Sequence, residues 1–192
     1  MSNVVLASAS PRRVELLKKL VENFTVFPSS VNETLNSESP EENAKRLAFE
    51  KANQISARFP DSIVIGADTI VAWNSEIFGK PTSPQDATRI LKALRGKKHS
   101  VITGVAVIKG AYKRVQCLES TVCMKKVGDQ DILAYVETGE PMDKAGAYGI
   151  QGKGGDMVVD SYRGSYSNIV GLPVELLEEI LQDSVFRESI SW

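Results

Sequence analysis

Residues 62–69, which read Ser-Ile-Val-Ile-Gly-Ala-Asp-Thr, limit the possible folds more than any other stretch. Residues 63–65 are an uninterrupted β-branched run, which is typical of a strand that is buried on both faces. Two small residues follow, and then the carboxylate of Asp68. A strand that ends in this way delivers Asp68 to the carboxyl edge of a sheet, where open α/β sheets bind ligands. The alternative is that Asp68 and Thr69 only begin a turn.

Other segments extend this pattern into a chain of strands and helices. Apolar or alternating runs predict strands over residues 4–7, 24–27, 70–73, 76–78, 99–108, 114–127 and 157–159. Helical periodicity and terminal signals predict helices that begin near residues 11, 40, 84, 129 and 174, of which the second runs to about residue 58. The sequence therefore predicts an α/β fold.

Length and composition are those of an ordinary globular protein. The 192 residues suffice for one domain or for two small lobes that share a core. The formal net charge of -1 gives no electrostatic reason to expect a nucleic-acid or membrane partner. The N-terminal residues lack a signal-peptide pattern, and no apolar run approaches membrane-spanning length. We therefore expect a cytoplasmic protein that binds neither nucleic acid nor membranes.

Cysteine and histidine are too few for the sites that they usually build. Cys117 and Cys123 lie six residues apart in a strand-like stretch, which suggests neither a disulfide scaffold nor a paired-ligand metal site. We expect both to be free thiols. His99 is the only histidine, so sites built from several histidines are excluded, and no nucleophile motif stands beside it.

Two arginines occupy the first turn of the first predicted helix. Ser10 is a good N-cap and Pro11 a good first helical residue. The free backbone N–H groups of such a helix start attract anions, and the helix dipole disfavours cations there. Arg12 and Arg13 are therefore easier to understand if an anion binds between them and the amides. The alternative is two solvated surface arginines.

Two lysines stand where a cation needs an explanation. Lys51 falls inside the apolar stripe of the helix that begins near residue 40, so it must either reach solvent or meet an anion. Lys80 lies between Gly79 and Pro81, and the proline stiffens the chain around it. We therefore expect Lys80 to be a fixed cation on a loop.

A glycine-dense segment follows Asp143. Five of the ten residues from Gly146 to Gly155 are glycine, which indicates unusual backbone torsions or the close approach of another group. The segment matches neither a P-loop nor the Gly-x-Gly-x-x-Gly fingerprint. A flexible linker is the alternative, but Tyr148, Ile150 and Gln151 interrupt the glycines.

These residue types are the ones that phosphate chemistry requires. Cations stabilise charge on phosphate oxygens, and carboxylates bind a divalent ion or activate water. The candidates are the cations Arg12, Arg13, Lys51, Lys80 and Lys144 and the acids Glu33 and Asp68. Spacing alone does not establish that they meet, so the residues by themselves predict an α/β protein that handles phosphates.

Several motifs, in order along the chain, resemble those of the Maf family of nucleoside triphosphate pyrophosphatases, historically called septum formation inhibitors. The matching segments are residues 8–13, 66–69, 79–81, 143–152 and 171–173. The ten residues Asp-Lys-Ala-Gly-Ala-Tyr-Gly-Ile-Gln-Gly from Asp143 are the most specific of them. The resemblance covers nearly the whole chain and implies a single domain over residues 1–192.

The resemblance implies a mixed elongated sheet flanked by helices, with two lobes around a cleft, similar to inosine triphosphate pyrophosphatases. It also implies hydrolysis between the α and β phosphates of a nucleoside triphosphate with Mg²⁺ or Mn²⁺, and a possible homodimer. Asp68 would accept the proton of the attacking water. Glu33, Lys51 and Lys80 would be the other catalytic residues, with Glu33 and Asp68 as metal ligands.

Substrate recognition is implied by a second set of positions. Ser8 and Arg13 would hold phosphates, and Arg12, Thr69 and Gln151 resemble the branch of the family that acts on dTTP and UTP. The amide of Gln151 can both donate to and accept from a pyrimidine edge. Such an enzyme would also remove modified pyrimidine nucleotides from the nucleotide pool.

Two other functions remain open from the sequence. The same residues could bind a nucleotide without turnover in a regulator of cell division and septum formation. Alternatively, Asp68 could act as the nucleophile of an aspartyl-phosphate phosphatase. That enzyme would release inorganic phosphate rather than pyrophosphate, and no second aspartate stands two residues beyond Asp68 to assist it.

Overall fold

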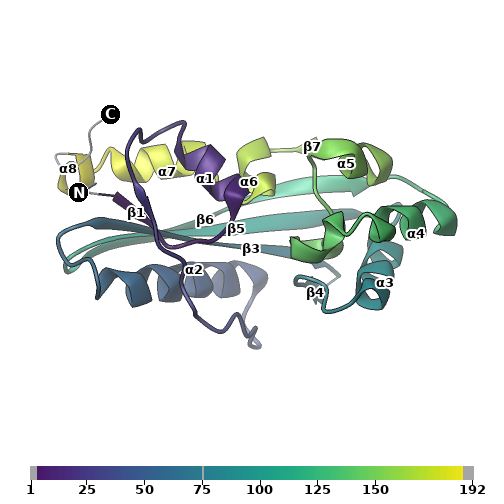
Figure 1. The fold of residues 1–192 in the computed structure, drawn as a ribbon, viewed down its shortest axis with the longest axis horizontal. Coiled ribbons are helices and arrows are strands. Elements are labelled where there is room, and N and C mark those ends of the chain that lie inside the picture. Colours follow the sequence, from purple (N-terminus) through teal and green to yellow (C-terminus); the bar gives the residue numbers. More distant parts are fainter. Residues whose placement is uncertain (1–3, 75, 188–192) are drawn as a thin grey trace. The chain divides into compact units, whose positions relative to one another are not determined.

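The structure is a computed structural model that describes residues 4–74 and 76–187 (Figure 1). The strands are β1 (Val4–Leu6), β2 (Thr25–Val26), β3 (Ile63–Trp73), β4 (Glu76–Phe78), β5 (Lys98–Lys109), β6 (Tyr112–Met124) and β7 (Val159–Arg163). The helices are α1 (Pro11–Leu17), α2 (Pro40–Ser56), α3 (Pro84–Leu94), α4 (Asp129–Glu137), α5 (Gly152–Val158), α6 (Tyr166–Val170), α7 (Val174–Leu181) and α8 (Ser184–Arg187). Two 3-10 turns, η1 (Glu140–Asp143) and η2 (Ala145–Ala147), lie between α4 and α5.

The strands of the described chain form one mixed sheet of seven strands. Their order is β2-β1-β3-β5-β6-β7, and β4 pairs with β3. β1 runs parallel to β2 and β3, whereas β4 and β7 run antiparallel to the strands they pair with. The prediction of a mixed α/β sheet flanked by helices is therefore confirmed.

The chain divides into two compact units. The first unit contains residues 4–68, 103–118 and 171–187 of the described chain, and the second contains the described part of 69–102 together with 119–170. Asp68 is the last residue of the first unit on β3, and Thr69 is the first residue of the second. Each unit has its own cluster of buried hydrophobic residues.

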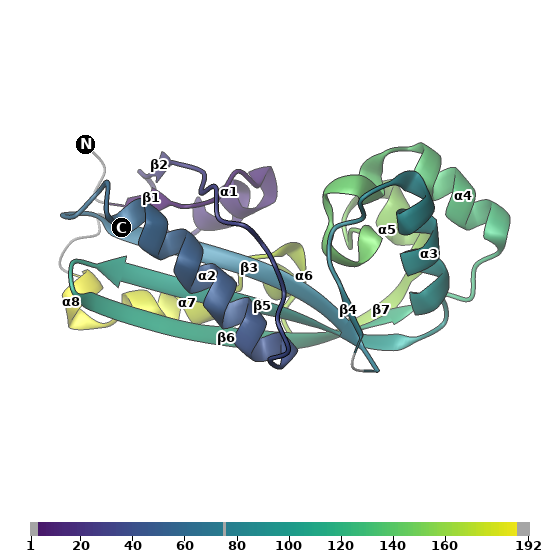
Figure 2. The same cartoon turned by 90° about the horizontal axis from the view of Figure 1, so that it is seen from below.

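In the first unit, helices cover both faces of the strands. α2 lies on one face, and α1 and α7 lie on the other (Figures 1 and 2). α2 packs very closely, because a Cβ atom on Gly66 would lie only 2.3 Å from the carbonyl oxygen of Ala48. Gly104 allows the same approach, with 2.2 Å to the carbonyl oxygen of Ala44. These glycines are therefore sites of helix contact.

The prediction that the strand ends just before Asp68 is wrong. β3 continues without a break from Ile63 to Trp73, and Asp68 lies in its interior. The small residue Gly66 makes room for α2 and does not end the strand. The parallel part of the sheet nevertheless ends nearby, because Leu6, the last residue of β1, pairs with Ile65. Asp68 therefore lies just past the carboxyl end of β1.

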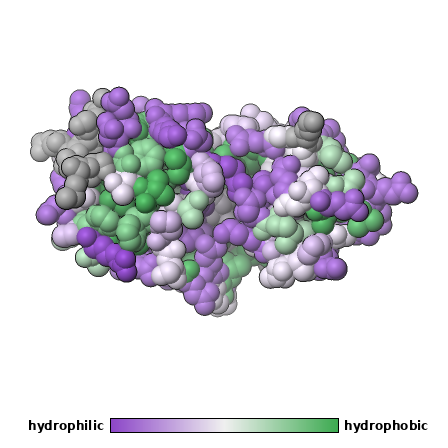
Figure 3. All heavy atoms as spheres, viewed as in Figure 1, coloured by the Kyte–Doolittle hydropathy of each residue, from purple (hydrophilic) through white to green (hydrophobic). Residues whose placement is uncertain are grey.

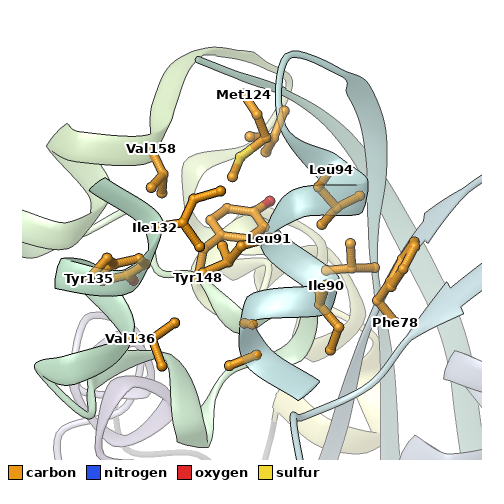
Figure 4. Packing of buried hydrophobic residues seen from close by; sticks show 14 of the residues in the cluster. Phe78, Ile90, Leu91, Leu94, Met124, Ile132, Tyr135, Val136, Tyr148 and Val158 are labelled. Carbon is orange, nitrogen blue, oxygen red and sulfur yellow. The ribbon is translucent and has the colours of Figure 1, made fainter. Parts of the chain in front are cut away.

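The second unit buries its hydrophobic residues between α3, α4, α5 and the glycine-dense segment. α3 contacts α4 and both 3-10 turns, and α4 contacts α5. Figure 4 shows Tyr148 in the middle of this cluster, between Leu91 and Ile132. The prediction of a helix that begins near residue 129 is confirmed by α4, which begins at Asp129.

The end of the glycine-dense segment differs from the prediction. The sequence predicts a strand over residues 157–159, but α5 extends to Val158 and β7 begins at Val159. Glycine-rich sequence carries no helical periodicity, so α5 had no signal in the sequence. The expectation of unusual torsions is confirmed, since φ is 71° at Gly146, 58° at Ala147 and 81° at Gly152.

The described helices, the surface and the two cysteines bear on further predictions from the sequence. No described helix is long and apolar enough to cross a membrane. Hydrophilic residues cover most of the face in Figure 3, and hydrophobic residues gather mainly toward its left side. Cys117 and Cys123 are both partly buried, and within the described chain neither forms a disulfide. The prediction of free thiols is confirmed.

Candidate active site

Lys51 of α2 joins two carboxylates in the first unit. Its Nζ lies 2.5 Å from Oδ1 of Asp68 and 2.7 Å from Oε1 of Glu33. The side chains of Lys51 and Asp68 are only 6% and 9% exposed, whereas that of Glu33 is 42% exposed. A buried ammonium group needs such partners, because an unpaired charge in the interior is strongly unfavourable. Of the two predicted alternatives for Lys51, the structure gives contact with anions.

The alternation of side chains along β3 explains how Asp68 reaches Lys51. Residues two apart on a strand point to the same face, so Gly66 and Asp68 both face α2. Because Gly66 has no side chain, the backbone of α2 lies against the strand at Ala48 and Ala52. Lys51 is then close enough to bond with Asp68 directly. The Gly-x-Asp spacing therefore determines the position of the ion pair.

The turn between β1 and α1 holds Ser8 and Arg13 in contact. Ser10 caps α1 by accepting a hydrogen bond from the backbone N–H of Arg13. Arg13 donates from Nη1 to Oγ of Ser8 at 3.3 Å and from Nε to the carbonyl oxygen of Gly171 at 2.7 Å. The backbone N–H of Ser10 also donates to Oγ of Ser8, at 3.2 Å. Arg12 lies half-buried in the same turn.

The electrostatic environment links this turn to the two acids. Burial lowers the pKa of the Arg13 guanidinium, and the negative charges of Asp68 and Glu33 oppose that shift. The guanidinium and the two carboxylates therefore interact across the interior of the first unit. Six predicted site residues, Ser8, Arg12, Arg13, Glu33, Lys51 and Asp68, thus belong to the first unit.

The remaining predicted site residues belong to the second unit. Thr69 is half-buried on β3, while Lys80 and Gln151 are exposed on their loops. The backbone N–H of Gly146 donates to the carbonyl oxygen of Gly79 at 3.1 Å, which connects the Lys80 loop to the glycine-dense segment. Whether these side chains meet Asp68 and Lys51 stays a prediction.

Lys144 has a local role that the sequence did not indicate. Its Nζ donates to the carbonyl oxygen of Glu140 at 2.5 Å and pairs with Asp143 at 2.8 Å. Both partners lie in η1, the turn immediately before Lys144. The lysine therefore stabilises the turn that begins the glycine-dense segment.

The sequence also gave no indication that His99 and Tyr148 are partners. Nε2 of His99 lies 2.7 Å from the hydroxyl oxygen of Tyr148, and the two rings meet edge to face. Burial lowers the pKa of His99 to about 4, so the ring is neutral at pH 7. The pair connects β5 to the glycine-dense segment through side chains that are 49 residues apart, a separation with no sequence signal.

The two carboxylates are suitable ligands for a divalent cation. Carboxylate oxygens are hard donors, and Mg²⁺ is commonly bound by one or two carboxylates together with substrate phosphates and water. Glu33 and Asp68 are held on one ammonium group, so their oxygens lie close together. Among the described residues, no group of three or more histidines, cysteines or acids is placed to hold a metal by itself. The donor set therefore fits a metal that is shared with a phosphate ligand.

Comparison with known proteins gives a consistent result. A curated protein of Syntrophus aciditrophicus named dTTP/UTP pyrophosphatase is 45% identical over 94% of this chain and 89% of its own length. Proteins with the same name from Dictyoglomus thermophilum and Methanosarcina mazei are 46% and 44% identical, over 93% and 100% of this chain and 94% and 100% of their own lengths.

A solved structure and a family match complete the comparison. The structure of a nucleoside-triphosphatase / dITP/XTP pyrophosphatase from Mycobacterium abscessus is 13% identical, with a TM-score of 0.47 over 97% of this chain and 94% of that one. Residues 3–184 match the family described as Maf-like protein. With this match and relatives at about 45% identity over nearly the full length, the chain belongs to the Maf-like family.

Proposed function

We propose that this protein is a nucleoside triphosphate pyrophosphatase that hydrolyses dTTP, UTP and modified pyrimidine nucleotides to the monophosphate and pyrophosphate. The relatives named dTTP/UTP pyrophosphatase support this substrate class. The reaction would remove unwanted nucleotides from the pool. We propose that residues 1–192 act as one catalytic domain.

One observation carries the proposal, namely the ion cluster of Lys51, Glu33 and Asp68. A protein that only needed stability could replace a buried ion pair by apolar side chains with little loss. Here a lysine lies in the apolar stripe of α2 and holds two acids, one of them buried and one partly exposed. Such a charge arrangement suits a site that binds a metal and a polyphosphate.

Asp68 is the proposed proton acceptor. Water attacks a phosphorus atom of the α–β phosphoanhydride, the bond from that phosphorus to the bridging oxygen breaks, and the proton of the water moves to the carboxylate. Lys51 fixes the orientation of this carboxylate through a 2.5 Å bond. Its positive charge also reduces the repulsion between the two acids and a polyphosphate.

A divalent cation, Mg²⁺ or Mn²⁺, is part of the proposal. Glu33 and Asp68 would hold it, and the ion would neutralise charge on the phosphate oxygens. Ser8 and Arg13 would bind phosphate, because the Arg13 guanidinium and the Ser8 hydroxyl group lie in contact at the turn before α1. From the second unit we propose Lys80 as a further catalytic cation. Two carboxylates alone do not complete the coordination of Mg²⁺, so phosphate oxygens and water would supply the other ligands.

Base recognition is assigned to the positions that distinguish the dTTP and UTP branch. These are Arg12, Thr69 and Gln151, of which Gln151 offers an exposed amide. Support for these roles, and for a homodimer in the cytoplasm, comes from the family resemblance. Replacement of Gln151 by leucine should therefore alter the preference between UTP and CTP, measured as the ratio of kcat/KM values.

The proposal is tested by product identification. Wild-type protein is incubated with dTTP, UTP, CTP, ATP and GTP in the presence of Mg²⁺ or Mn²⁺, and pyrophosphate and inorganic phosphate are measured separately. We expect pyrophosphate, and a loss of about 1,000-fold in Asp68→Asn because the proton acceptor is removed. Asp61→Asn is the matched control, since Asp61 is an exposed acid of the same unit.

Each other product pattern supports a different function. Nucleotide binding without product would support the regulator of cell division. Inorganic phosphate with a trappable acyl phosphate on Asp68 would support the aspartyl-phosphate phosphatase. Equal rates in wild type and Asp68→Asn would exclude Asp68 as the proton acceptor.

A further inference from the structure

The segment that carries Glu33 has no regular structure of its own. Between the end of β2 at Val26 and the start of α2 at Pro40 the chain forms neither helix nor strand. Residues 30–38, which we call the Glu33 segment, are largely exposed. A carboxylate on such a segment would adopt many positions unless other groups restrain the backbone.

The restraint comes from one face of α2. Along the Glu33 segment, successive residues contact successively earlier residues of the helix. Ser30 bonds with Gln54, Glu33 with Lys51, the carbonyl group of Thr34 with Arg46, and Asn36 with Asn43. Positions 43, 46 and 54 fall on one face of the helix by its 3.6-residue period, and Lys51 lies beside that face. The segment therefore runs antiparallel to α2, with Glu33 between two sets of contacts.

Asn43 makes four hydrogen bonds to the backbone of residues 36–39. Its side chain is fully buried, although asparagine is usually exposed. Oδ1 accepts from the backbone N–H of Asn36 at 3.1 Å, and Nδ2 donates to the carbonyl oxygens of Asn36 at 3.4 Å, Glu38 at 3.0 Å and Ser39 at 3.2 Å. A single amide thus holds the backbone at three positions.

Arg46 acts closest to the acid. Its Nη2 donates to the carbonyl oxygen of Thr34 at 2.8 Å, and Thr34 directly follows Glu33. The same nitrogen donates to Oδ1 of Asn43 at 2.8 Å, and Nη1 pairs with Glu50 at 3.0 Å. The bond to Thr34 contributes nothing to the capping of α2, which Ser39 provides. Its effect is to fix the peptide next to Glu33.

We propose that Arg46 and Asn43 are positioning residues that hold Glu33 at the metal and phosphate site. This inference rests on the proposed function for the role of Glu33, but the restraint itself does not. A carboxylate that is held before the ligand arrives loses less conformational freedom on binding. Arg46 and Asn43 therefore determine metal affinity and turnover through Glu33 without touching the substrate.

The test replaces Arg46 by methionine and uses Lys45→Met as the matched control. Lys45 is the adjacent residue of the same helix and also carries one positive charge, but it pairs with the exposed Glu42 and not with the Glu33 segment. We expect Arg46→Met to lower kcat by about tenfold or more and to raise the Mg²⁺ concentration for half-maximal activity similarly. Lys45→Met should change both values by less than about twofold.

A double-variant comparison separates positioning from general damage. In the Glu33→Gln background, Arg46→Met should change the residual kcat by less than about twofold, because the carboxylate through which it acts is gone. If Arg46→Met lowers activity equally in both backgrounds, Arg46 does not act through Glu33 and the inference is wrong. Gln54→Leu, which loses only the bonds to Ser30, should fall between the control and Arg46→Met.

A readout without substrate keeps the inference independent of the enzymatic activity. A protease that cleaves after glutamate is applied to the folded proteins, and the rate of cleavage at Glu33 and Glu38 is measured. Arg46→Met should be cleaved at least about tenfold faster than wild type and Lys45→Met at nearly the wild-type rate, at equal melting temperatures. Equal cleavage rates in all three would overturn the inference. Faster cleavage with no pyrophosphate release from any nucleotide would overturn the proposed function alone.

Discussion

The two units bury polar side chains in opposite ways. In the first unit Lys51, 5% exposed, pairs with the carboxylates of Asp68 and Glu33. In the second unit His99, 3% exposed, stays neutral and shares a hydrogen bond with the hydroxyl group of Tyr148. Among the described residues, the buried polar side chains therefore include a charged pair in the first unit, Lys51 and Asp68, and only neutral groups in the second, those of His99, Ser120 and Asn168.

This difference indicates that the buried charges of the first unit serve chemistry, whereas the neutral pair of the second unit serves structure. Burial of ions is unfavourable even when they are paired, so a charged cluster is an inefficient way to stabilise a fold. A neutral pair such as His99 and Tyr148 satisfies its hydrogen bond at much smaller desolvation. We therefore assign chemistry to the charged interior, and we assign to the neutral interior the role of holding the glycine-dense segment on β5.

The largest effect is expected from Lys51→Met. The variant leaves Asp68 buried next to Glu33 without the cation that bonds to it directly, which should lower the free energy of unfolding by about 3 kcal/mol. Pyrophosphate release should fall by about 1,000-fold, because a fixed cation next to the phosphates is lost. Urea denaturation and the nucleotide assay measure the two effects separately.

A second variant tests whether the unpaired charge causes the instability. Lys51→Met combined with Asp68→Asn removes both buried charges, so its stability should return to within about 1 kcal/mol of the wild type while activity stays absent. If the double variant is as unstable as the single one, the lysine stabilises the unit through the packing of its methylene groups. The instability of Lys51→Met would then not be evidence for a buried charge in the first unit.

The neutral interior should respond to acid. The unfolded chain binds a proton on His99 below about pH 6.5, whereas burial lowers the pKa in the folded protein to about 4. The contribution to stability is therefore complete above pH 6.5 and is lost as the pH falls from 6.5 to 4. Over this range the wild type should lose about 3 kcal/mol more than His99→Gln, measured by urea denaturation at each pH.

His99→Gln is a suitable reference because all carboxylates are the same in both proteins. Acid titration of these carboxylates therefore cancels in the difference, and glutamine can still bond with the hydroxyl group of Tyr148. Parallel stability curves for the two proteins between pH 6.5 and 4 would show that the ring is protonated in the folded state. The second unit would then also contain a buried charge.

The sequence was informative wherever local chemistry decides the structure. α1, α2 and α3 begin at residues 11, 40 and 84 as predicted, and Ser10, Ser39 and Ser83 cap them. Lys51 could be identified as an anomaly because a lysine in an apolar stripe requires a partner. The family motifs predicted the family and the mixed sheet.

The sequence was uninformative wherever distant residues decide the structure. Nothing near Gly66 shows that its space is filled by α2, so the sequence predicts that the strand ends at the small residues, although β3 continues past them. The pairing of His99 with Tyr148 depends on how α3, α4 and the glycine-dense segment pack together. The contacts of Asn43 and Arg46 with the Glu33 segment have the same origin, because a polar residue on a helix gives no sign of which loop will cover it.

The smallest effect is expected from the exposed ion pairs of the second unit, which complete the contrast with Lys51. Arg89 of α3 pairs with Asp86 at 3.0 Å and with Glu76 at 3.2 Å, so it has two acidic partners as Lys51 does. Its side chain is 58% exposed, however, and water solvates all three groups when the pairs are broken. Arg89→Met should therefore change the free energy of unfolding by less than about 1 kcal/mol, and high salt should remove most of that difference. Urea denaturation of Arg89→Met and Lys51→Met, each at low and high salt, makes the comparison directly. A loss in Arg89→Met as large as that in Lys51→Met would mean that the number of acidic partners, and not their burial, determines what a lysine or arginine contributes in this protein.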